Sequence, residues 1–275
     1  HRFQLPDHQS GMRDQAHAFI KYFFNVLKAT KAQKYDVVVA TSSRLFTAAL
    51  GAFIAKRNNA KLYLDIRDLF IDTMKDVLNN SPANVLVPIL RFFERWTFKA
   101  ATKINVVSGG FLPYFNKSLY RYDLSVYTNG IDKSFVTTNF KKEAMNSRPT
   151  ILYAGNLGQG QGLDTILPMA AKTLSQNYSF ILVGGGGRRK ELEDRLSSDD
   201  IENVELLNPV PRKELMSLYR DADILFLHLN DFNAFKKVLP SKIFEYSATG
   251  KPILAGVAGF AADFLNKSLL IQHGS

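Results

Sequence analysis

Short β-branched runs alternate along this chain with longer segments of helical pattern, and this alternation constrains the fold more than any other feature. In the first half, strands are predicted at Asp36–Ser42, Lys61–Arg67, Lys103–Ser108 and Leu124–Thr128. Helices are predicted at Gln15–Thr30, Leu45–Lys56 and Ser81–Ala101. The run Asp36–Ser42 is apolar throughout its centre, which indicates a fully buried strand. Strands that alternate with helices predict a parallel sheet with right-handed crossovers.

The alternation starts again after a polar stretch. Residues 131–149 lack periodicity and contain Lys141, Lys142 and Pro149, so we interpret the stretch as a linker. Strands are then predicted at Thr150–Ala154, Phe180–Val183, Val204–Leu207, Ile224–Leu229 and Pro252–Ala255. Helices are predicted at Asp164–Gln176, Arg188–Ser197, Arg212–Asp221 and Ser241–Thr249. The prediction is therefore two α/β domains, an incomplete one over residues 1–135 and a second over 150–275, joined by a linker over 136–149.

Both ends of the chain fall inside this alternation. The first domain opens on a helix instead of a strand, and residues 269–272 look like a strand with nothing after it. We therefore expect a fragment that lacks parts of both domains and turns over poorly by itself.

The charge of the chain is concentrated in its first half. The net charge is +10; residues 1–147 hold 21 Lys and Arg against 11 Asp and Glu, whereas residues 148–275 hold 14 of each. Such asymmetry indicates that one half meets a polyanion, either a nucleic acid or an anionic membrane surface; a charge that serves only solubility is the plainer interpretation. The segment Val85–Lys99 combines apolar residues with Arg91, Arg95 and Lys99, which predicts salt-sensitive binding to anionic vesicles; burial of most of its apolar face in the core is the alternative.

Several classes of site and segment are excluded by composition. The longest apolar segment, Val85–Phe98, is interrupted by charges and is too short to span a membrane. The chain has no cysteine, and its five histidines form no metal-binding spacing. Asp221 and Asp223 match the letters of a metal-binding DxD motif, but they lie where a helix ends and a buried strand begins, and we assign them no metal.

Two glycine-rich loops follow predicted strands of the second domain. In the first, Gly155, Asn156, Gly158 and Gly160 precede a helix, so backbone N–H groups can approach an anion. In the second, Gly184–Gly187 leads into Arg188 and Lys190, which are candidate phosphate ligands. The alternative for either is an ordinary flexible loop with surface charges. The spacing is not GxGxxG, which disfavours a nicotinamide cofactor.

Two further segments lie at strand ends. Pro209 and Val210 follow a strand and form either a loop that contacts a nucleotide base or a structural turn. Pro240 and Ser241 begin a helix that places Lys242 in its first turn and Glu245 one turn later, and Gly250 ends it. A lysine there opposes the helix dipole, which indicates an anionic ligand; an ordinary surface ion pair between Lys242 and Glu245 is the alternative.

These motifs together resemble a known family. The segments AGNLGQGQGLD and VLPSKIFEYSATGKP, the strand ending in VGGGG, the run Asp65–Phe70 and the hinge-like Thr128–Asp132 look like retaining GT-B glycosyltransferases of the large family of bacterial polysaccharide, mannosyl and fucosamine-type transferases. The resemblance covers most of residues 35–265. It implies the GT-B fold, two doubly wound Rossmann-like domains that face each other across a cleft.

The resemblance also implies a function. A nucleotide-diphosphate-sugar donor would bind the second domain, with Glu245 on the ribose, Lys242 on the diphosphate, and the donor sugar beside Lys237, Leu239, Pro240 and Ser241. The family has a glutamate where this chain has Lys237, and a lysine where it has Gln161. The expected activity is transfer of a hexose or N-acetylhexosamine, without metal or cofactor, in polysaccharide biosynthesis.

For the acceptor side, the resemblance implies a glycan or a polyprenyl-linked acceptor on the first domain. It places Asp68 and Arg67 among acceptor-side or catalytic groups; a structural ion pair between the two is the alternative. We expect a cytoplasmic protein attached peripherally to the inner face of an anionic membrane, with no nucleic-acid partner.

Two rival functions are weaker. A non-hydrolysing nucleotide-sugar epimerase would share the twin-domain sheet but needs acid/base carboxylates and a histidine, and only His228 lies at a strand end. A basic nucleic-acid-binding protein would gather its cations in a recognisable motif, whereas here they are dispersed over helices.

Overall fold

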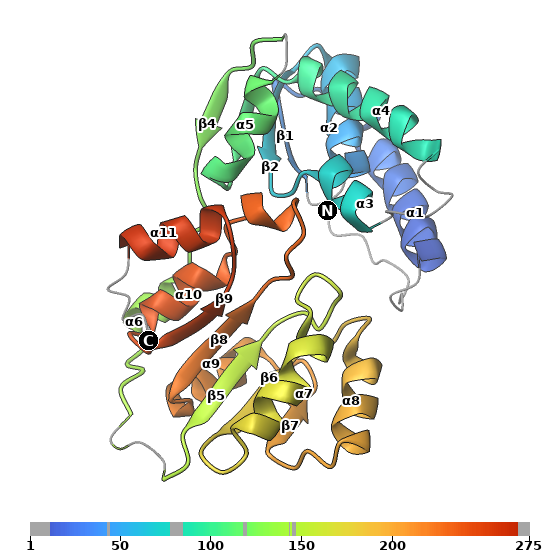
Figure 1. Cartoon of the computed structure of the whole chain (residues 1–275). Coiled ribbons are helices and arrows are strands. Elements are labelled where there is room, and N and C mark those ends of the chain that lie inside the picture. Colours follow the sequence, from blue (N-terminus) through green and yellow to red (C-terminus); the bar gives the residue numbers. More distant parts are fainter. Residues whose placement is uncertain are drawn as a thin grey trace. The chain divides into compact units, whose positions relative to one another are not determined.

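The chain forms two compact units, His1–Thr128 and Asn129–Ser275, each built on its own parallel sheet (Figure 1). The computed structural model describes residues 12–42, 45–77, 85–117, 120–142, 144 and 147–268. The strand predicted at 269–272 lies outside the described residues. Within the described part, no helix combines the length and apolarity that crossing a membrane requires.

The N-terminal unit has four parallel strands in the order β1-β2-β3-β4. These are β1 (Val37–Ser42), β2 (Lys61–Ile66), β3 (Lys103–Val106) and β4 (Leu124–Val126). The helices are α1 (Met12–Thr30), α2 (Leu45–Asn58), α3 (Phe70–Val77), α4 (Val87–Ala100) and α5 (Leu112–Asn116). All four predicted strands are confirmed. The short helices α3 and α5 were not predicted, since neither is long enough to show a helical period.

Strand β1 differs from its prediction. It pairs only with β2 and is therefore an edge strand of the described sheet, and Val37 and Val39 are 55% and 65% exposed. The prediction of a fully buried strand is wrong, because an apolar run cannot by itself distinguish a central strand from an edge strand.

The C-terminal unit has five parallel strands in the order β7-β6-β5-β8-β9. These are β5 (Thr150–Ala154), β6 (Ser179–Val183), β7 (Val204–Leu207), β8 (Ile224–His228) and β9 (Ile253–Gly256). The helices are α6 (Lys133–Thr137), α7 (Leu163–Thr173), α8 (Arg189–Ser198), α9 (Arg212–Asp221), α10 (Lys242–Ala248) and α11 (Phe260–Ser268), with a 3₁₀ turn, η3, at Phe235–Lys237. Helix α10 ends at Gly250 in the left-handed conformation, φ +68°, as predicted.

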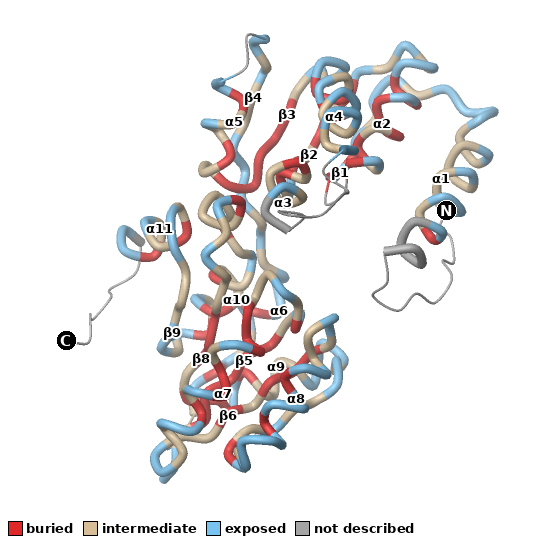
Figure 2. Tube along the Cα trace, turned by 45° about the vertical axis from the view of Figure 1, so that its right-hand side comes forward, coloured by how far each residue is buried: buried red, intermediate tan, exposed pale blue. Residues whose placement is uncertain are grey.

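Both faces of this second sheet are covered. On one face Leu163 and Leu167 of α7 and Leu192 of α8 pack on β5 and β6. On the other, Tyr219 of α9 and Tyr246 of α10 pack together with α6 and α11. Figure 2 shows the central strands as the buried interior of the unit. The fold is thus two Rossmann-like α/β units.

The boundary between the units differs from the predicted one. Residues 129–149 belong to the C-terminal unit, and the side chains of Phe135 and Phe140 are 1% and 3% exposed in its core. Their rings stack at 5.9 Å. The stretch was interpreted as a linker because it is mostly polar, and its two core residues, Phe135 and Phe140, form no periodic pattern with their neighbours.

Candidate functional site

The candidate site of the C-terminal unit lies where the strand order reverses. The chain runs outward from β5 through β6 to β7, and then returns to the other side of β5 as β8. Ligands of open α/β sheets bind at the carboxyl ends of the strands beside such a reversal. The loops after β5, β6 and β8 therefore form the framework of the site.

The two glycine-rich loops are joined by backbone hydrogen bonds. The N–H of Gly155 donates to Val183 O at 2.8 Å, and the N–H of Leu157 donates to Gly185 O at 2.8 Å. Gly184 has φ +152°, and a methyl group there would lie 1.8 Å from Gly155 O. Only glycine allows this approach, which fixes the two loops as one surface.

The loop after β5 is also held by residues that follow β8. The side chain of Asn230 donates to Gln159 O at 2.5 Å, and its N–H donates to Gly160 O at 2.9 Å. His228 Nδ1 lies 2.6 Å from Gln161 O. Gly162, the N-cap of α7, takes φ +61° directly against the Asn230 side chain. These contacts hold the loop in one conformation at the start of a helix.

Lys242 of α10 crosses the first glycine loop. A methyl group at Gly155 would lie 2.6 Å from Cε and 3.3 Å from Nζ of Lys242, so the glycine makes room for the lysine. The ammonium group lies 5.9 Å from the centre of the Tyr246 ring. Burial lowers the pKa of Lys242, opposed by the carboxylate of Glu245. Lys242 forms no ion pair with a described residue, and this cation beside backbone N–H groups suits a phosphate.

Glu245 has a partner that sequence reasoning missed. Arg212, the first residue of α9, lies 3.6 Å from Glu245 Oε1 and 2.5 Å from Asp132 Oδ2. Its guanidinium is 4.6 Å from the centre of the Phe135 ring. Glu245 retains 19% exposure of its side chain, which is therefore partly accessible to solvent. No local pattern in the sequence could predict this ion pair, because Arg212 and Glu245 are 33 positions apart.

The cations at the second glycine loop divide into an inward and an outward set. Arg189, which was not predicted, donates to Gly184 O at 2.6 Å and Leu207 O at 2.8 Å and joins the ends of β6 and β7. Arg188 lies 3.4 Å from Glu191, and Lys190 is exposed. The two predicted phosphate ligands thus lie at the start of α8, Arg188 as its N-cap and Lys190 on its surface, and Arg189 between them holds the two strand ends together.

The remaining predicted donor residues differ in their surroundings. Asn156 donates to Gln161 Oε1 at 3.1 Å and lies over Gly158, while Gly160 packs under the Phe235 ring. Pro209 is exposed and adjoins Gly185, whereas Val210 packs on the core.

The segment before α10 also serves the core. Leu239 is 2% exposed and belongs to the core of the C-terminal unit. Lys237 and Pro240 are half-buried, and Ser241 is exposed. The burial of Leu239 in the core thus fixes the segment that precedes Lys242.

At the carboxyl edge of the N-terminal sheet, polar side chains are held in a network. Asn105 of β3 donates to Asp65 Oδ1 of β2 at 2.7 Å and accepts from the N–H of Tyr127 at 2.8 Å. Arg67 forms an ion pair with Asp65 at 3.9 Å. Asp68 accepts a hydrogen bond from the Thr73 hydroxyl at 3.1 Å, and burial raises the pKa of its carboxyl group. Asp68 is thus a carboxylic acid near a strand end that is shielded from solvent and has a raised pKa, which suits an acid/base role.

The described residues contain no group of histidine and acidic side chains that could hold a metal ion. Asp223 is buried, accepts the N–H of Thr150 at 2.8 Å and pairs with Lys142 at 2.8 Å. It therefore anchors the start of β5 and faces away from the glycine loops.

Comparisons with known proteins give a consistent result. Residues 135–269, which contain every predicted donor-side residue, match the family model described as Glycosyl transferases group 1. Over 263 residues the chain is 22% identical to the putative colanic acid biosynthesis glycosyl transferase WcaI of Escherichia coli K12, covering 90% of this chain and 64% of that protein.

A second curated relative comes from Campylobacter jejuni. It is the GalNAc-alpha-(1->4)-GalNAc-alpha-(1->3)-diNAcBac-PP-undecaprenol alpha-1,4-N-acetyl-D-galactosaminyltransferase, 27% identical over 82% of this chain and 56% of its own length. The chain thus spans less than two thirds of both curated relatives.

Solved structures show the same fold. Sucrose-phosphate synthase from Thermosynechococcus elongatus superposes with a TM-score of 0.68 at 13% identity, covering 96% of this chain and 66% of that one. Anabaena HepE in complex with UDP and glucose gives 0.64 at 17% identity, covering 96% and 68%. Residues 135–269 thus match the Glycosyl transferases group 1 family model, and the solved structures show that the chain has the GT-B fold of two Rossmann-like domains.

Proposed function

We propose that this chain transfers a sugar from a nucleoside-diphosphate donor to a glycan or lipid-linked acceptor in polysaccharide biosynthesis. The observation that carries the proposal is Lys242, held across Gly155 at the strand-order reversal beside two joined glycine loops. This geometry supplies a desolvated cation and backbone donors where a leaving diphosphate gains charge. Uridine is the first nucleoside to test, because the HepE complex contains UDP.

In the proposed reaction the two units have different tasks. Lys242 and the α7 N-terminus stabilise the departing diphosphate without a metal or resident cofactor, and the carboxylate of Glu245 accepts hydrogen bonds from the ribose. Asp68 is the acceptor-side group, and Arg67 orients the acceptor. The family resemblance is the support for the proposed retention of configuration and for the proposed hexosyl or N-acetylhexosaminyl donor. The Campylobacter relative, whose name includes a diphosphate-undecaprenol acceptor, suggests the acceptor class.

A donor screen tests this function. Melting temperatures of the full chain are measured with UDP, UMP, uridine, UDP-glucose and UDP-N-acetylgalactosamine, followed by incubation of any stabilising donor with a polyprenyl-diphosphate saccharide. We expect UDP and one UDP-sugar to raise the melting temperature more than UMP or uridine, and the product to keep the anomeric configuration of the donor. Isomerisation of the donor without transfer would indicate the epimerase instead, and stabilisation by oligonucleotides alone would indicate a nucleic-acid-binding protein.

A peripheral position on the cytoplasmic face of an anionic membrane is the second part of the proposal. Helices α1, α2 and α4 expose large apolar side chains, among them Phe24 at 63% and Phe92 at 67%. Ring contacts of Phe46 with Phe19 at 5.9 Å and with Phe93 at 6.1 Å connect the three helices in one patch. Exposed apolar patches of this kind mark interaction sites, and the basic charge of this half favours an anionic surface.

Vesicle binding tests that position. The chain is sedimented with vesicles of phosphatidylcholine alone and with added phosphatidylglycerol, at low and high salt. We expect stronger binding to the anionic vesicles and a severalfold loss with the double substitution Phe24→Ser and Phe92→Ser. Phe53→Ser is the control, because Phe53 is an exposed apolar residue of the same unit whose ring contacts none of the described rings of the patch. Equal binding to neutral and anionic vesicles would exclude the proposed position.

A further inference from the structure

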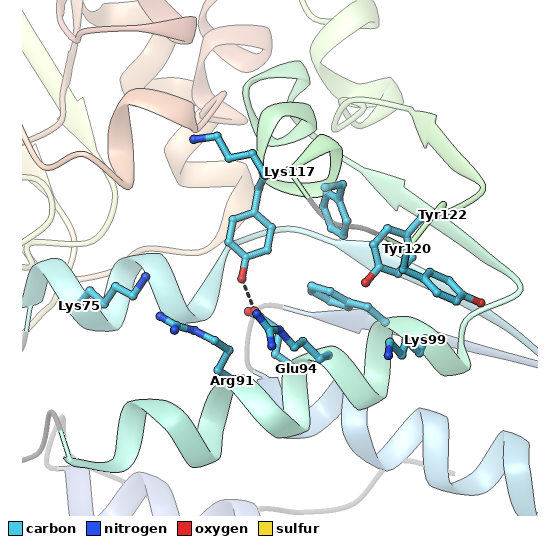
Figure 3. Close-up of a pocket in the computed structure, with 11 residues that line it drawn as sticks. Lys75, Arg91, Glu94, Lys99, Lys117, Tyr120 and Tyr122 are labelled. Carbon is cyan, nitrogen blue, oxygen red and sulfur yellow. Dashed lines mark hydrogen bonds between the residues drawn. The ribbon is translucent and has the colours of Figure 1, made fainter.

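A pocket of about 700 Å³ lies within the N-terminal unit, and its lining does not include the carboxyl-edge residues Asp65 and Asn105. Its walls come from α4, α5, the end of α3 and residues 120–122; we name it the α4–α5 pocket. In Figure 3, Lys75, Arg91 and Glu94 lie together at one end, and Lys99, Tyr120 and Tyr122 lie at the other. The pocket has the size of a small-molecule site.

One wall of the pocket is a row of cations. Arg91, Arg95 and Lys99 recur every four residues, so they share one face of α4 and extend over about 12 Å of helix. Like charges at this spacing destabilise a helix. None of the three forms an ion pair with a described residue, and Lys117 adds a fourth such cation to the lining. A row of unpaired cations around a concave space indicates an anionic ligand.

The acid in the lining of the pocket does not neutralise this row. Glu94 is 2% exposed and accepts a hydrogen bond from the hydroxyl of Tyr114. Burial, with a smaller effect from the nearby carboxylate of Asp72, raises the pKa of Glu94 to about 7, against the opposing effects of the Tyr114 hydrogen bond and Lys75. The carboxyl group therefore carries only part of a negative charge near neutrality.

Aromatic rings line the rest of the pocket, one of them, Phe98, from α4 itself. The rings of Phe98 and Phe115 are 5.1 Å apart, and Phe115 and Tyr122 are 5.6 Å apart. Lys99 lies 5.9 Å from the centre of the Tyr120 ring. Aromatic faces next to cations suit a ligand that joins anionic groups to an apolar or ring-shaped part.

We propose that the α4–α5 pocket binds phosphate groups, and that in the proposed transfer these are the phosphates of the acceptor. The row on α4 presents several charges along a line, as a diphosphate or a phosphate-bearing chain requires, and the aromatic rings accommodate what is attached to it. This inference rests on the proposed function for the identity of the acceptor, but the phosphate site itself stands on the pocket alone.

The test is a calorimetric titration of the full chain with inorganic pyrophosphate in saturating UDP, which occupies the other expected phosphate site. The variants are Arg95→Gln, Lys99→Gln and the double variant, with Lys56→Gln as a control that removes one exposed charge from α2 in the same unit. We expect pyrophosphate affinity to fall about tenfold or more with each substitution in the pocket, and to be unchanged in the control.

The same variants are then titrated with phosphatidylglycerol vesicles. Competition between vesicles and pyrophosphate would assign the phosphate to a lipid headgroup, and independent binding would assign it to the acceptor. Equal pyrophosphate affinity in the double variant and in Lys56→Gln would overturn the phosphate site. UDP affinity separates this failure from that of the proposed function, since UDP binding should be the same in wild type and all pocket variants.

Discussion

The Lys242 site of the C-terminal unit and the α4–α5 pocket of the N-terminal unit both offer positive charge to an anion, but they present it in different ways. Lys242 is a single, partly desolvated cation that crosses a surface of backbone groups, and its position depends on glycines that leave room for it. The α4–α5 pocket gathers five basic side chains next to aromatic rings, and its lining includes no glycine. We infer that the Lys242 site binds its anion through close approach to the backbone, and that the α4–α5 pocket binds its anion mainly through charge.

If the close approach of the two glycine loops matters most at the Lys242 site, a methyl group added at their contact should lower stability and UDP affinity more than any other single substitution. Gly184→Ala would place Cβ 1.8 Å from Gly155 O, which is backbone and cannot move without separating the two loops. We expect a loss of several kcal/mol in the free energy of unfolding of the C-terminal unit and a loss of UDP binding.

The matched control for this change is Gly250→Ala. Gly250 also has positive φ, at +68°, but nothing lies within 4 Å of the added methyl group. Its cost should be only about 1–2 kcal/mol, from the left-handed conformation itself. Chemical denaturation and UDP titration compare the two variants. Equal effects would show that the loss of stability comes from the backbone conformation of the glycine and not from the close approach of the two loops.

The N-terminal pocket should instead respond to pH through Glu94. Burial raises the pKa of this carboxyl group from 4.5 to about 7, so the folded unit retains a proton that the unfolded chain has released. The stabilising effect of that proton is complete below pH 4.5 and is lost as the pH rises through 7. Glu94→Gln removes this dependence, and its stability relative to wild type should rise by on the order of 3 kcal/mol between pH 4.5 and 8.

Trp96 on α4, the single tryptophan of the chain, reports this unfolding by fluorescence in urea. Asp123→Asn, which changes an exposed acid of the same unit, should show no comparable change with pH. A stability difference between wild type and Glu94→Gln that stays constant from pH 4.5 to 8 would contradict the assigned pKa.

A smaller effect is expected at Glu245. Glu245→Ala removes a carboxylate proposed to bind the ribose and should weaken both uridine and UDP by roughly 10- to 150-fold, the value of a charged hydrogen bond of about 1.5–3 kcal/mol. Arg212→Gln is the companion variant, because it removes the partner of Glu245 and keeps the carboxylate. Nucleoside affinity that falls with Arg212→Gln but not with Glu245→Ala would assign the ligand contact to the arginine.

The two regions also differ in how far the sequence could predict them. The strands and glycine loops of the C-terminal unit, and the position of Lys242 in the first turn of α10, follow from local patterns, because strand, turn and helix signals lie within a few residues of each other. The ion pair between Arg212 and Glu245 joins α9 to α10, and the burial of Phe135 depends on packing against Tyr219; neither leaves a local signal.

The α4–α5 pocket shows the same limit. The basic spacing of α4 was visible in the sequence and was interpreted as a membrane-facing surface. That α5 and residues 120–122 contribute to the lining of the pocket could not be predicted, because α5 is only five residues long and its place depends on tertiary contacts. Likewise Glu94 gave no sign of its raised pKa, which arises from its burial next to Tyr114.

The central claim, that Lys242 meets the diphosphate of a nucleotide donor, is tested most directly by titrating UDP and uridine against wild type, Lys242→Ala and Lys190→Ala. Lys190 is an exposed lysine of α8 beside the second glycine loop and controls for the loss of one charge. We predict that Lys242→Ala weakens UDP by about tenfold or more and leaves uridine nearly unchanged, because only UDP carries the phosphates. We also expect Lys190→Ala to have a much smaller effect on UDP. If Lys242→Ala lowers the affinities for UDP and uridine equally, or lowers neither, the account of this site is contradicted.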